Sequence, residues 1–143
     1  MKDVTLSEHF KLSEFTRSET ARRNFIRNTP PPTARENLLT LVSMILEPAR
    51  RQLGEPIAIS SGYRCKKLND IIGGAYNSQH LCGEAADIIL PSPQYAKRLI
   101  DILKENPNVD QLLYEHKGQK VWLHVSCATT RKPRRMIRLH YKA

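Results

Sequence analysis

Apolar residues between positions 38 and 49 recur at the three- and four-residue spacing of one helix face. They are Leu38, Leu41, Val42, Ile45, Leu46 and Ala49. Upstream, Thr33 and Glu36 match a capping box, which predicts Thr33 as the N-cap of this helix. Pro48 should bend the helix or end its regular part, because proline lacks a backbone donor, and Gly54 should end it. The pattern therefore predicts a long helix from residue 33 to about residue 54.

Capping and turn signals predict three shorter helices. Residues 18–24 favour a short helix, and residues 65–72 favour a second one, closed by Gly73 and Gly74. Ser92 and Pro93 should begin a third helix over residues 93–104, where apolar residues again follow helical spacing.

Strand signals lie between these helices. Short apolar or alternating runs predict strands at residues 56–60, 85–90, 110–115, 120–126 and 135–141. The third and fourth should form a hairpin with Lys117 and Gly118 as its two-residue turn. We therefore expect an α+β fold, in which a mostly antiparallel sheet has helices packed on one side. Residues 1–143 should form one small domain, with residues 1–28 packing onto a core of residues 29–143.

The length and composition agree with such a domain. A chain of 143 residues, of which 40% are hydrophobic, can bury the core of one globular domain. No run approaches the roughly 18 apolar residues of a membrane span, and the first residues lack the apolar core of a signal peptide. We therefore expect synthesis in the cytoplasm, no membrane span and a monomeric protein.

The net charge of +9 is unevenly distributed, since no acidic residue follows Glu115. A basic surface favours anionic partners, such as bacterial cell wall or nucleic acid. A solvated basic edge strand that resists edge-to-edge pairing is the alternative interpretation. The chain contains no recognisable nucleic-acid-binding motif, so we do not expect a nucleic-acid partner.

One residue before Gly83 and one after it together suggest a metal site. His80 precedes this glycine, and Asp87 follows it inside the apolar run of residues 85–90. An unpaired buried carboxylate is costly, and a metal ion shared with His80 would compensate it. Zinc accepts both histidine nitrogen and carboxylate oxygen, and a catalytic zinc site has three protein ligands and a water. A third ligand is therefore expected elsewhere in the chain.

His124 is the candidate for that third ligand. In the predicted strand 120–126 it shares the more polar face with Trp122 and Ser126. Alone, such a residue is more often a hydrogen-bonded core histidine, but the pair of His80 and Asp87 favours a metal ligand. The cysteines, Cys65, Cys82 and Cys127, are odd in number and favour free thiols, with zinc ligation by Cys82 as an alternative.

Several ordered motifs carry a resemblance to a known family. They are S-G-Y-R at residues 61–64, a later N and G-G, S-x-H-x-x-G-x-A-x-D at residues 78–87, and W-L-H-V-S at residues 122–126. Together they resemble the zinc D-Ala-D-Ala carboxypeptidase and L-alanyl-D-glutamate-type endolysin peptidase family, whose fold is shared with the hedgehog signalling domain. Residues 9–18 and 46–50 resemble its phage-like and bacterial branch. The resemblance implies a Zn²⁺ peptidase acting on the peptide part of bacterial cell wall.

The resemblance also suggests how other residues contribute. It gives Arg64 the role of binding a substrate carboxylate or stabilising the oxyanion, which a planar guanidinium does well. A salt bridge with Asp70 is the alternative role for Arg64. Ser78 and Gln79 should line the site and orient its ligands, and Trp122 should contact the substrate.

A peptidase of this kind also needs a carboxylate that takes the proton of the attacking water. Relatives often place an acid three residues before the last histidine ligand, but here that residue is Val121. Glu115 is the best substitute, because the hedgehog-like branch has Y-E at the end of the preceding strand. With the predicted turn, Glu115 pairs with Lys120 and lies about 13 Å along the strand from His124, which is long for direct contact. A surface carboxylate paired with Lys120 is the alternative.

We therefore expect a zinc-dependent peptidoglycan peptidase, either a D,D-carboxypeptidase or an endolysin-like endopeptidase, that uses a metal-activated water. It should reach the cell wall after lysis or after delivery by a particle. The alternative is a catalytically weak or inactive zinc-containing module that binds cell wall, since the acid before His124 is missing. The sequence leaves open which peptide bond is cut.

Overall fold

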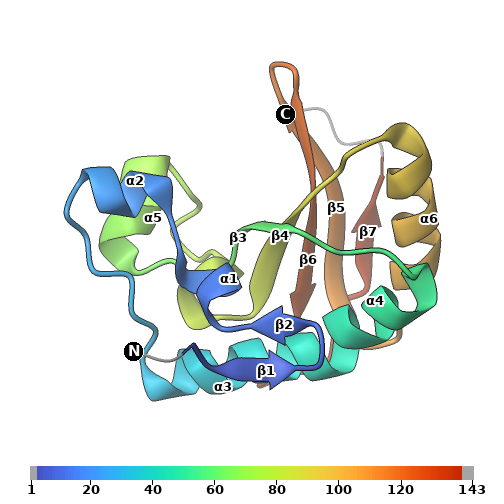
Figure 1. Cartoon of the computed structure of the whole chain (residues 1–143), viewed down its shortest axis with the longest axis horizontal. Helices are drawn as coiled ribbons and strands as arrows, with labels where there is room; N and C mark the ends of the chain where they lie inside the picture. The colour runs from blue at the N-terminus through green and yellow to red at the C-terminus, as the bar shows by residue number, and fades with distance from the viewer. Residues whose placement is uncertain (1–2, 140–143) are drawn as a thin grey trace.

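The structure, a computed structural model, describes residues 3–139. Its centre is a five-stranded sheet with the strand order β3-β4-β6-β5-β7 (Figure 1). The strands are β3 (Ile59–Ser61), β4 (Ala85–Ile89), β5 (Val109–Lys117), β6 (Lys120–Cys127) and β7 (Met136–Arg138). Neighbouring strands are antiparallel, except that β5 and β7 are parallel. The predicted α+β fold with a mostly antiparallel sheet is confirmed.

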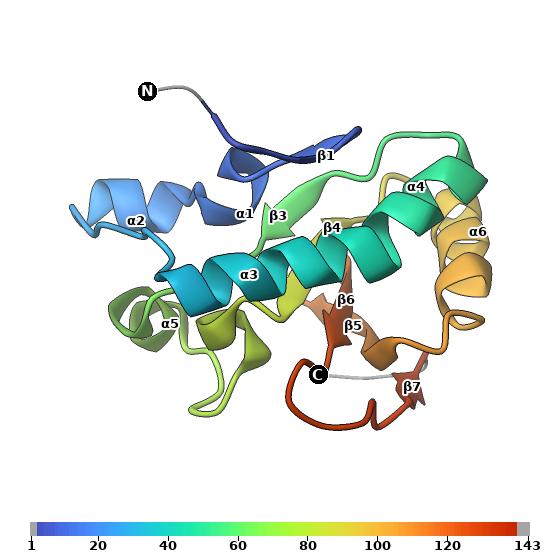
Figure 2. The same ribbon diagram turned by 90° about the horizontal axis from the view of Figure 1, so that it is seen from below.

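One long helix and one shorter helix supply most of the helical part of the core. The long helix is continuous through α3 (Pro32–Leu41), the π-helical turn η1 (Val42–Leu46) and α4 (Glu47–Leu53), and α6 (Pro93–Leu103) lies near its end (Figure 2). Their buried leucines and isoleucines share one cluster with Ile88, Leu112 and Leu123 of the sheet. The helices therefore cover one sheet face, as predicted, and no helix among residues 3–139 is long and apolar enough to cross a membrane.

The start of the long helix differs from the prediction. Pro31 occupies the N-cap position and Pro32 begins the helix, so Thr33 lies within the first turn and the capping box is wrong. The two prolines explain the difference, because a fixed φ near −65° suits the first helical position and needs no N–H donor there.

Pro48 has the predicted effect on this helix. The regular α-helix ends before it, and in the π-turn the Glu47 N–H donates to the Val42 carbonyl, five residues back. Pro48 cannot bond to the carbonyl of Met44, and the side chain of Asn106 donates to that carbonyl instead, at 2.9 Å. The helix then continues to Gly54, whose positive φ of 73° ends it as predicted.

The strands agree with the prediction in order but not in every boundary. The first is shorter than residues 56–60, because only Ile59–Ser61 pairs with β4. The last covers Met136–Arg138, and the part of the predicted strand from residue 140 lies outside the described residues.

The hairpin turn was predicted one residue too early. Gly118 and Gln119 form the turn, and Lys117 pairs with Lys120. Gly118 has a positive φ of 62°, which suits the first central position of a two-residue hairpin turn. As a result Glu115 pairs with Trp122, whereas the prediction paired it with Lys120. The shift is even, so each side chain keeps its predicted face.

Short elements complete the molecule on either side of the long helix. They are β1 (Thr5–Ser7), β2 (Phe10–Lys11), α1 (Ser13–Thr16), α2 (Glu19–Arg23), α5 (Lys66–Ile72) and the 3₁₀-helix η2 (Gln79–Cys82). Phe10 and Phe15 of the N-terminal segment are buried in the main core. The Phe15 carbonyl accepts from the N–H of Tyr63 at 2.7 Å, next to Arg64. The N-terminal segment therefore supports the chain that carries Arg64, while the proposed division at residue 28 stays a prediction.

Candidate metal centre

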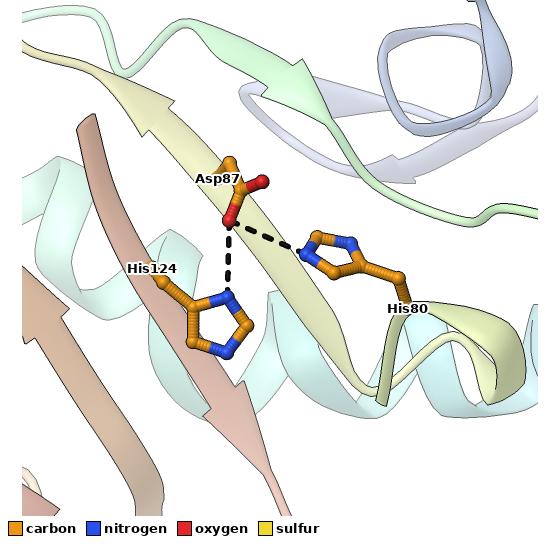
Figure 3. A group of neighbouring side chains, drawn as sticks. All are labelled: His80, Asp87 and His124. Atoms are coloured by element: carbon orange, nitrogen blue, oxygen red, sulfur yellow. Dashed lines mark hydrogen bonds and ion pairs between the residues drawn. The ribbon is translucent and has the colours of Figure 1, made fainter. Parts of the chain in front are cut away.

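Three side chains from three elements meet on the sheet face that the long helix leaves uncovered (Figure 3). His80 lies in η2, Asp87 in β4 and His124 in β6, and all three are buried. Asp87 Oδ1 lies 3.0 Å from His124 Nδ1 and 3.3 Å from His80 Nε2. One potential ligand atom from each residue lies within 4.8 Å of the others, so the three could hold one metal ion.

Local structure brings these residues together. Asp87 and His124 are direct partners across β4 and β6, and the alternation of both strands turns Ala86 and Val125 toward the helices instead. His80 enters from the side, because Gly83 adopts φ 79° and reverses the chain between η2 and β4.

The hydrogen bond of His80 determines which ring nitrogen faces the cluster. Its Nδ1 lies 2.6 Å from the carbonyl oxygen of Gly62, which only accepts, so Nδ1 must carry the hydrogen. In a neutral ring, Nε2 then presents its lone pair to Asp87 Oδ1, and two acceptors face each other. A cation between them would turn this opposition into coordination, and a carbonyl-bound second nitrogen is typical of metal-ligating histidine.

His124 fits the same interpretation. Its Nδ1 faces Asp87, and its Nε2 is buried with no hydrogen-bond partner among residues 3–139. Two histidine nitrogens and one carboxylate oxygen are donors that zinc prefers, and three protein ligands leave the fourth position open. The residues present therefore fit a zinc ion.

The electrostatics of Asp87 favour an ionised carboxylate. Burial raises the pKa of the Asp87 carboxyl, but the positive charge and donated hydrogen bonds of His80 and His124 in their protonated forms outweigh burial and hold this pKa well below its usual range. The other oxygen, Oδ2, accepts from Arg64 Nη2 at 3.2 Å.

The cluster forms part of a cleft of about 690 Å³. One wall is the chain from Ile72 to Gln79, and the other is the exposed face of β5 and β6, including Leu113 and Trp122. Arg64, Ser78, Gln79, Glu115 and Trp122, predicted from the sequence to serve the site, all line this cleft. Their roles in the site stay predictions.

Arg64 does not pair with Asp70, which instead bonds to Lys66. Its Nε donates to Ser61 Oγ and its Nη1 donates to Asn69 Oδ1, in addition to the bond with Asp87. Burial lowers the pKa of the guanidinium, and the charges of Asp87 and Glu115 oppose that shift.

Glu115 lies nearer to the cluster than the predicted hairpin turn implied. In the observed register Leu113, two residues before Glu115, pairs with His124, so Glu115 lies about 7 Å along the strand from that candidate ligand. The indole Nε1 of Trp122 donates to Glu115 Oε1 at 3.3 Å. A surface pair with Lys120 is therefore not formed.

Ser78 and Gln79 support the segment that carries His80. Ser78 Oγ accepts from the His80 N–H at 3.2 Å and caps η2. Gln79 Nε2 donates to the carbonyl of Cys127 at 2.9 Å, which ties η2 to the end of β6.

Sequence reasoning missed three residues of the site and left open whether Cys82 is a zinc ligand. Asn69, the N between S-G-Y-R and G-G, is buried and holds Arg64, and Lys117 and Arg134 line the cleft. Lys117 and Arg134 belong to the basic segment after Glu115, whose position in the fold the sequence does not indicate. The three cysteines are free, as predicted, and Cys82 bonds to Glu84 rather than joining the metal ligands.

Comparison with known proteins places the chain in a family. The family model described as Peptidase M15 matches residues 8–126. The chain belongs to the peptidase M15 family. All three candidate ligands fall within the part that matches the M15 family, whereas Arg134 lies beyond it.

One curated relative agrees with this M15 assignment. The zinc D-Ala-D-Ala carboxypeptidase of Streptomyces albus G is 40% identical over 57 residues, which are 39% of this chain. The same alignment covers 22% of the relative, so this M15 chain matches less than a quarter of that protein.

Proposed function

We propose that this M15 family chain is a zinc-dependent peptidase that hydrolyses peptide bonds in bacterial cell-wall peptides. The observation that carries the proposal is the buried cluster of His80, Asp87 and His124 in an open cleft. The family, and the description of the Streptomyces relative as a zinc D-Ala-D-Ala carboxypeptidase, support the metal, the reaction and the substrate class.

The chain would hold the ion through His80 Nε2, Asp87 Oδ1 and His124 Nδ1, which already converge. When bound, zinc lowers the pKa of a water toward about 7 and polarises the scissile carbonyl. Gly62 keeps His80 in the tautomer that the site needs, and Arg64 fixes the orientation of the Asp87 carboxylate.

Glu115 would accept the proton of the attacking water and pass it to the leaving amine. Among the described residues that line the cleft, Glu115 is the only carboxylate besides the ligand Asp87. Trp122 binds Oε1, and Oε2 has no partner among residues 3–139, so one oxygen is available. Val121, where relatives often carry the acid, is 40% exposed and does not line the cleft.

Arg64 would bind a substrate carboxylate or the developing oxyanion. Its bonds to Ser61, Asn69 and Asp87 use one hydrogen on each nitrogen. One N–H on each of Nη1 and Nη2 therefore has no partner among the described residues, and the guanidinium lines the cleft.

The decisive experiment combines metal analysis with digestion of purified cell wall. We expect one zinc per chain, loss of zinc when His80, Asp87 and His124 are changed to Ala, and peptide products that disappear with chelator and return with zinc.

Glu115→Gln should keep zinc and the melting temperature but lower hydrolysis at least about a hundredfold, the lower end of general-base contributions. Glu105→Gln, which changes an exposed carboxylate outside the cleft, is the matched control.

Two outcomes would contradict the proposal in different ways. Full hydrolysis by Glu115→Gln would assign the base elsewhere. An inactive parent protein with zinc bound would favour a module that binds cell wall without cutting it. Whether the chain cuts as an endolysin after lysis or delivery by a particle stays a prediction, and mass analysis of the products would show which bond is cut.

A further inference from the structure

A second arginine lines the cleft, and it comes from the other edge of the sheet. Arg64 follows the edge strand β3, and Arg134 precedes the other edge strand, β7. The ligands Asp87 and His124 lie on β4 and β6, between these two edges. In the strand order, the two arginines therefore flank the candidate metal ligands.

Arg134 is held by a buried carboxylate. Asp110 has no exposed surface and accepts from Arg134 Nε, from Nη2 at 2.7 Å and from the backbone N–H at 2.6 Å. The same Nη2 donates to Gln79 Oε1 at 3.2 Å, next to the ligand His80. These bonds fix the guanidinium plane, so it can bind a ligand with little further loss of side-chain entropy.

The remaining nitrogen of Arg134 is available to a ligand. No bond from its Nη1 is formed with residues 3–139, and the side chain is 42% exposed. A hydrogen of Nη1 can donate to an oxygen of a ligand carboxylate, which gives a charge-assisted hydrogen bond.

Arg131 provides a contrast that separates structure from ligand binding. It donates to both oxygens of Asp110, like Arg134, and its side chain is 44% exposed. Unlike Arg134, it does not line the cleft. Both arginines neutralise the charge of Asp110. This shared role therefore does not explain why Arg134 lines the cleft and Arg131 does not.

The charges of the cleft indicate the kind of ligand. Arg64, Lys117 and Arg134 line it together with two carboxylates, Asp87 and Glu115. Because a bound dication would add to this positive excess, the cleft favours an anionic peptide.

We propose that Arg134 forms a carboxylate-binding subsite on the β7 side of the metal centre, which selects peptides with a free carboxylate on each side of the scissile bond. This inference rests on the proposed peptidase function and adds the acidic character of the substrate. Arg64 would bind the carboxylate on the β3 side, and Arg134 Nη1 would bind the other.

The test uses zinc-loaded full-length protein and three versions of one synthetic cell-wall peptide: both carboxylates free, or one or the other converted to an amide. Arg134→Gln should lower kcat/KM for the diacid about 10- to 100-fold, the range for a hydrogen bond to a charged group. The loss should be in KM, because the contact is remote from the reacting atoms and equal in the ground and transition states. For the peptide amidated on the β7 side, the variant and the parent should be equal.

Arg131→Gln is the matched control, since it removes the same charge and a bond to the same Asp110. It should leave the discrimination between diacid and amide unchanged. If Arg134→Gln does not fold, the double variant Asp110→Asn with Arg134→Gln removes the buried carboxylate's charge together with its partner. Zinc content and the melting temperature are measured for every variant.

The outcomes separate this inference from the proposed function. An unchanged preference for the diacid in the folded, zinc-containing Arg134 variant would overturn the inference and leave the peptidase proposal intact. If the parent cuts none of the three peptides, the peptidase proposal fails. Calorimetric binding of the diacid to parent and variant then tests the subsite, with equal dissociation constants as the result that refutes it.

Discussion

Asp87 shows how one side chain can organise a site. Its Oδ1 faces both candidate histidine ligands, and its Oδ2 accepts from Arg64. A carboxylate in a buried strand is tolerated because every neighbour within bonding distance can carry positive charge or a donor. The guanidinium of Arg64 therefore has two possible functions, to position Asp87 and to bind a substrate anion, and these can be separated by experiment.

Arg64→Lys should weaken hydrolysis while leaving zinc in place. Lysine keeps the charge but cannot form the planar fork that reaches Asp87, Asn69 and a substrate carboxylate together. Since a hydrogen bond to a charged group contributes about 1.5–3 kcal/mol, we expect kcat/KM to fall roughly 10- to 100-fold. Steady-state kinetics and zinc analysis check this, with Arg98→Lys as control, because Arg98 pairs with Glu55 away from the cleft. Normal turnover in Arg64→Lys would show that only charge is needed.

At the scale of elements, the 3₁₀-helix η2 is positioned by its contact with α3. Asn37 of α3 donates to the Cys82 carbonyl at 2.9 Å. Gly83, which follows η2, lies so close to α3 that an added Cβ would be 2.2 Å from the Ala34 carbonyl oxygen. The long helix thus sets the position of His80, although no residue of that helix lines the cleft.

This close approach predicts a large cost for Gly83→Ala. Gly54 is a suitable comparison, because its φ of 73° is similar to the 79° of Gly83 but an added Cβ meets nothing within 4 Å. Gly54→Ala should cost about 1–2 kcal/mol of unfolding free energy for the left-handed backbone. Gly83→Ala should cost about 1–3 kcal/mol more, because backbone must move.

Chemical denaturation and zinc titration check the two glycine variants. Gly83→Ala should also weaken zinc binding, since displacement of η2 moves His80, whereas Gly54→Ala should not. Equal losses of stability in the two variants would mean that the contact with α3 relaxes without cost.

At the scale of the whole molecule, one carboxylate fastens the N-terminal segment to the long helix. Glu47 is buried where the π-turn passes into α4. Its oxygens accept from the Ser7 hydroxyl, from the His9 N–H at 2.8 Å and from His9 Nδ1 at 2.7 Å. The segment that includes the buried Phe10 and Phe15 is thereby joined to a helix forty residues further along the chain.

These bonds predict a specific dependence of stability on pH. Burial raises the pKa of Glu47, but the hydrogen bonds from Ser7 and His9 outweigh burial and lower the pKa from 4.5 to about 2. An acid with a lowered native pKa contributes stability above its unfolded pKa and loses that contribution as pH falls toward the native pKa. The unfolding free energy should therefore fall by on the order of 3 kcal/mol through this group between pH 5 and pH 2.

Glu47→Gln should remove this part of the acid transition. Urea unfolding at several pH values should give a variant that is less stable near pH 7 and whose stability falls less between pH 5 and pH 2. Glu105→Gln, at an exposed site, should leave the parent profile unchanged. A parallel decline of Glu47→Gln and parent would contradict the role of Glu47.

The sequence by itself determined the main helices and the strands of the central sheet, and which face of them each side chain takes. The helical spacing of residues 38–49, the capping residue Ser92 and the glycines after helices are local signals, and these elements occur as predicted. The two-residue period of a strand likewise set His124 and Trp122 on one face, and the predicted hairpin turn put Glu115 on that face as well, since the error in its register was even. The motif with His80 and Asp87 added the candidate ligands, which the fold brings together.

Only the tertiary structure decided how far apart these groups lie. Glu115 lies opposite Trp122 because Gly118, rather than Lys117, occupies the position of the turn that needs positive φ. That change of two residues brings the carboxylate about 7 Å closer along the strand to His124. Arg64 binds Asp87 instead of Asp70, and Arg134 enters the cleft through Asp110, because these partners become neighbours only when distant strands pair. Local pattern fixes the direction of a side chain, whereas register and long-range pairing fix its partners.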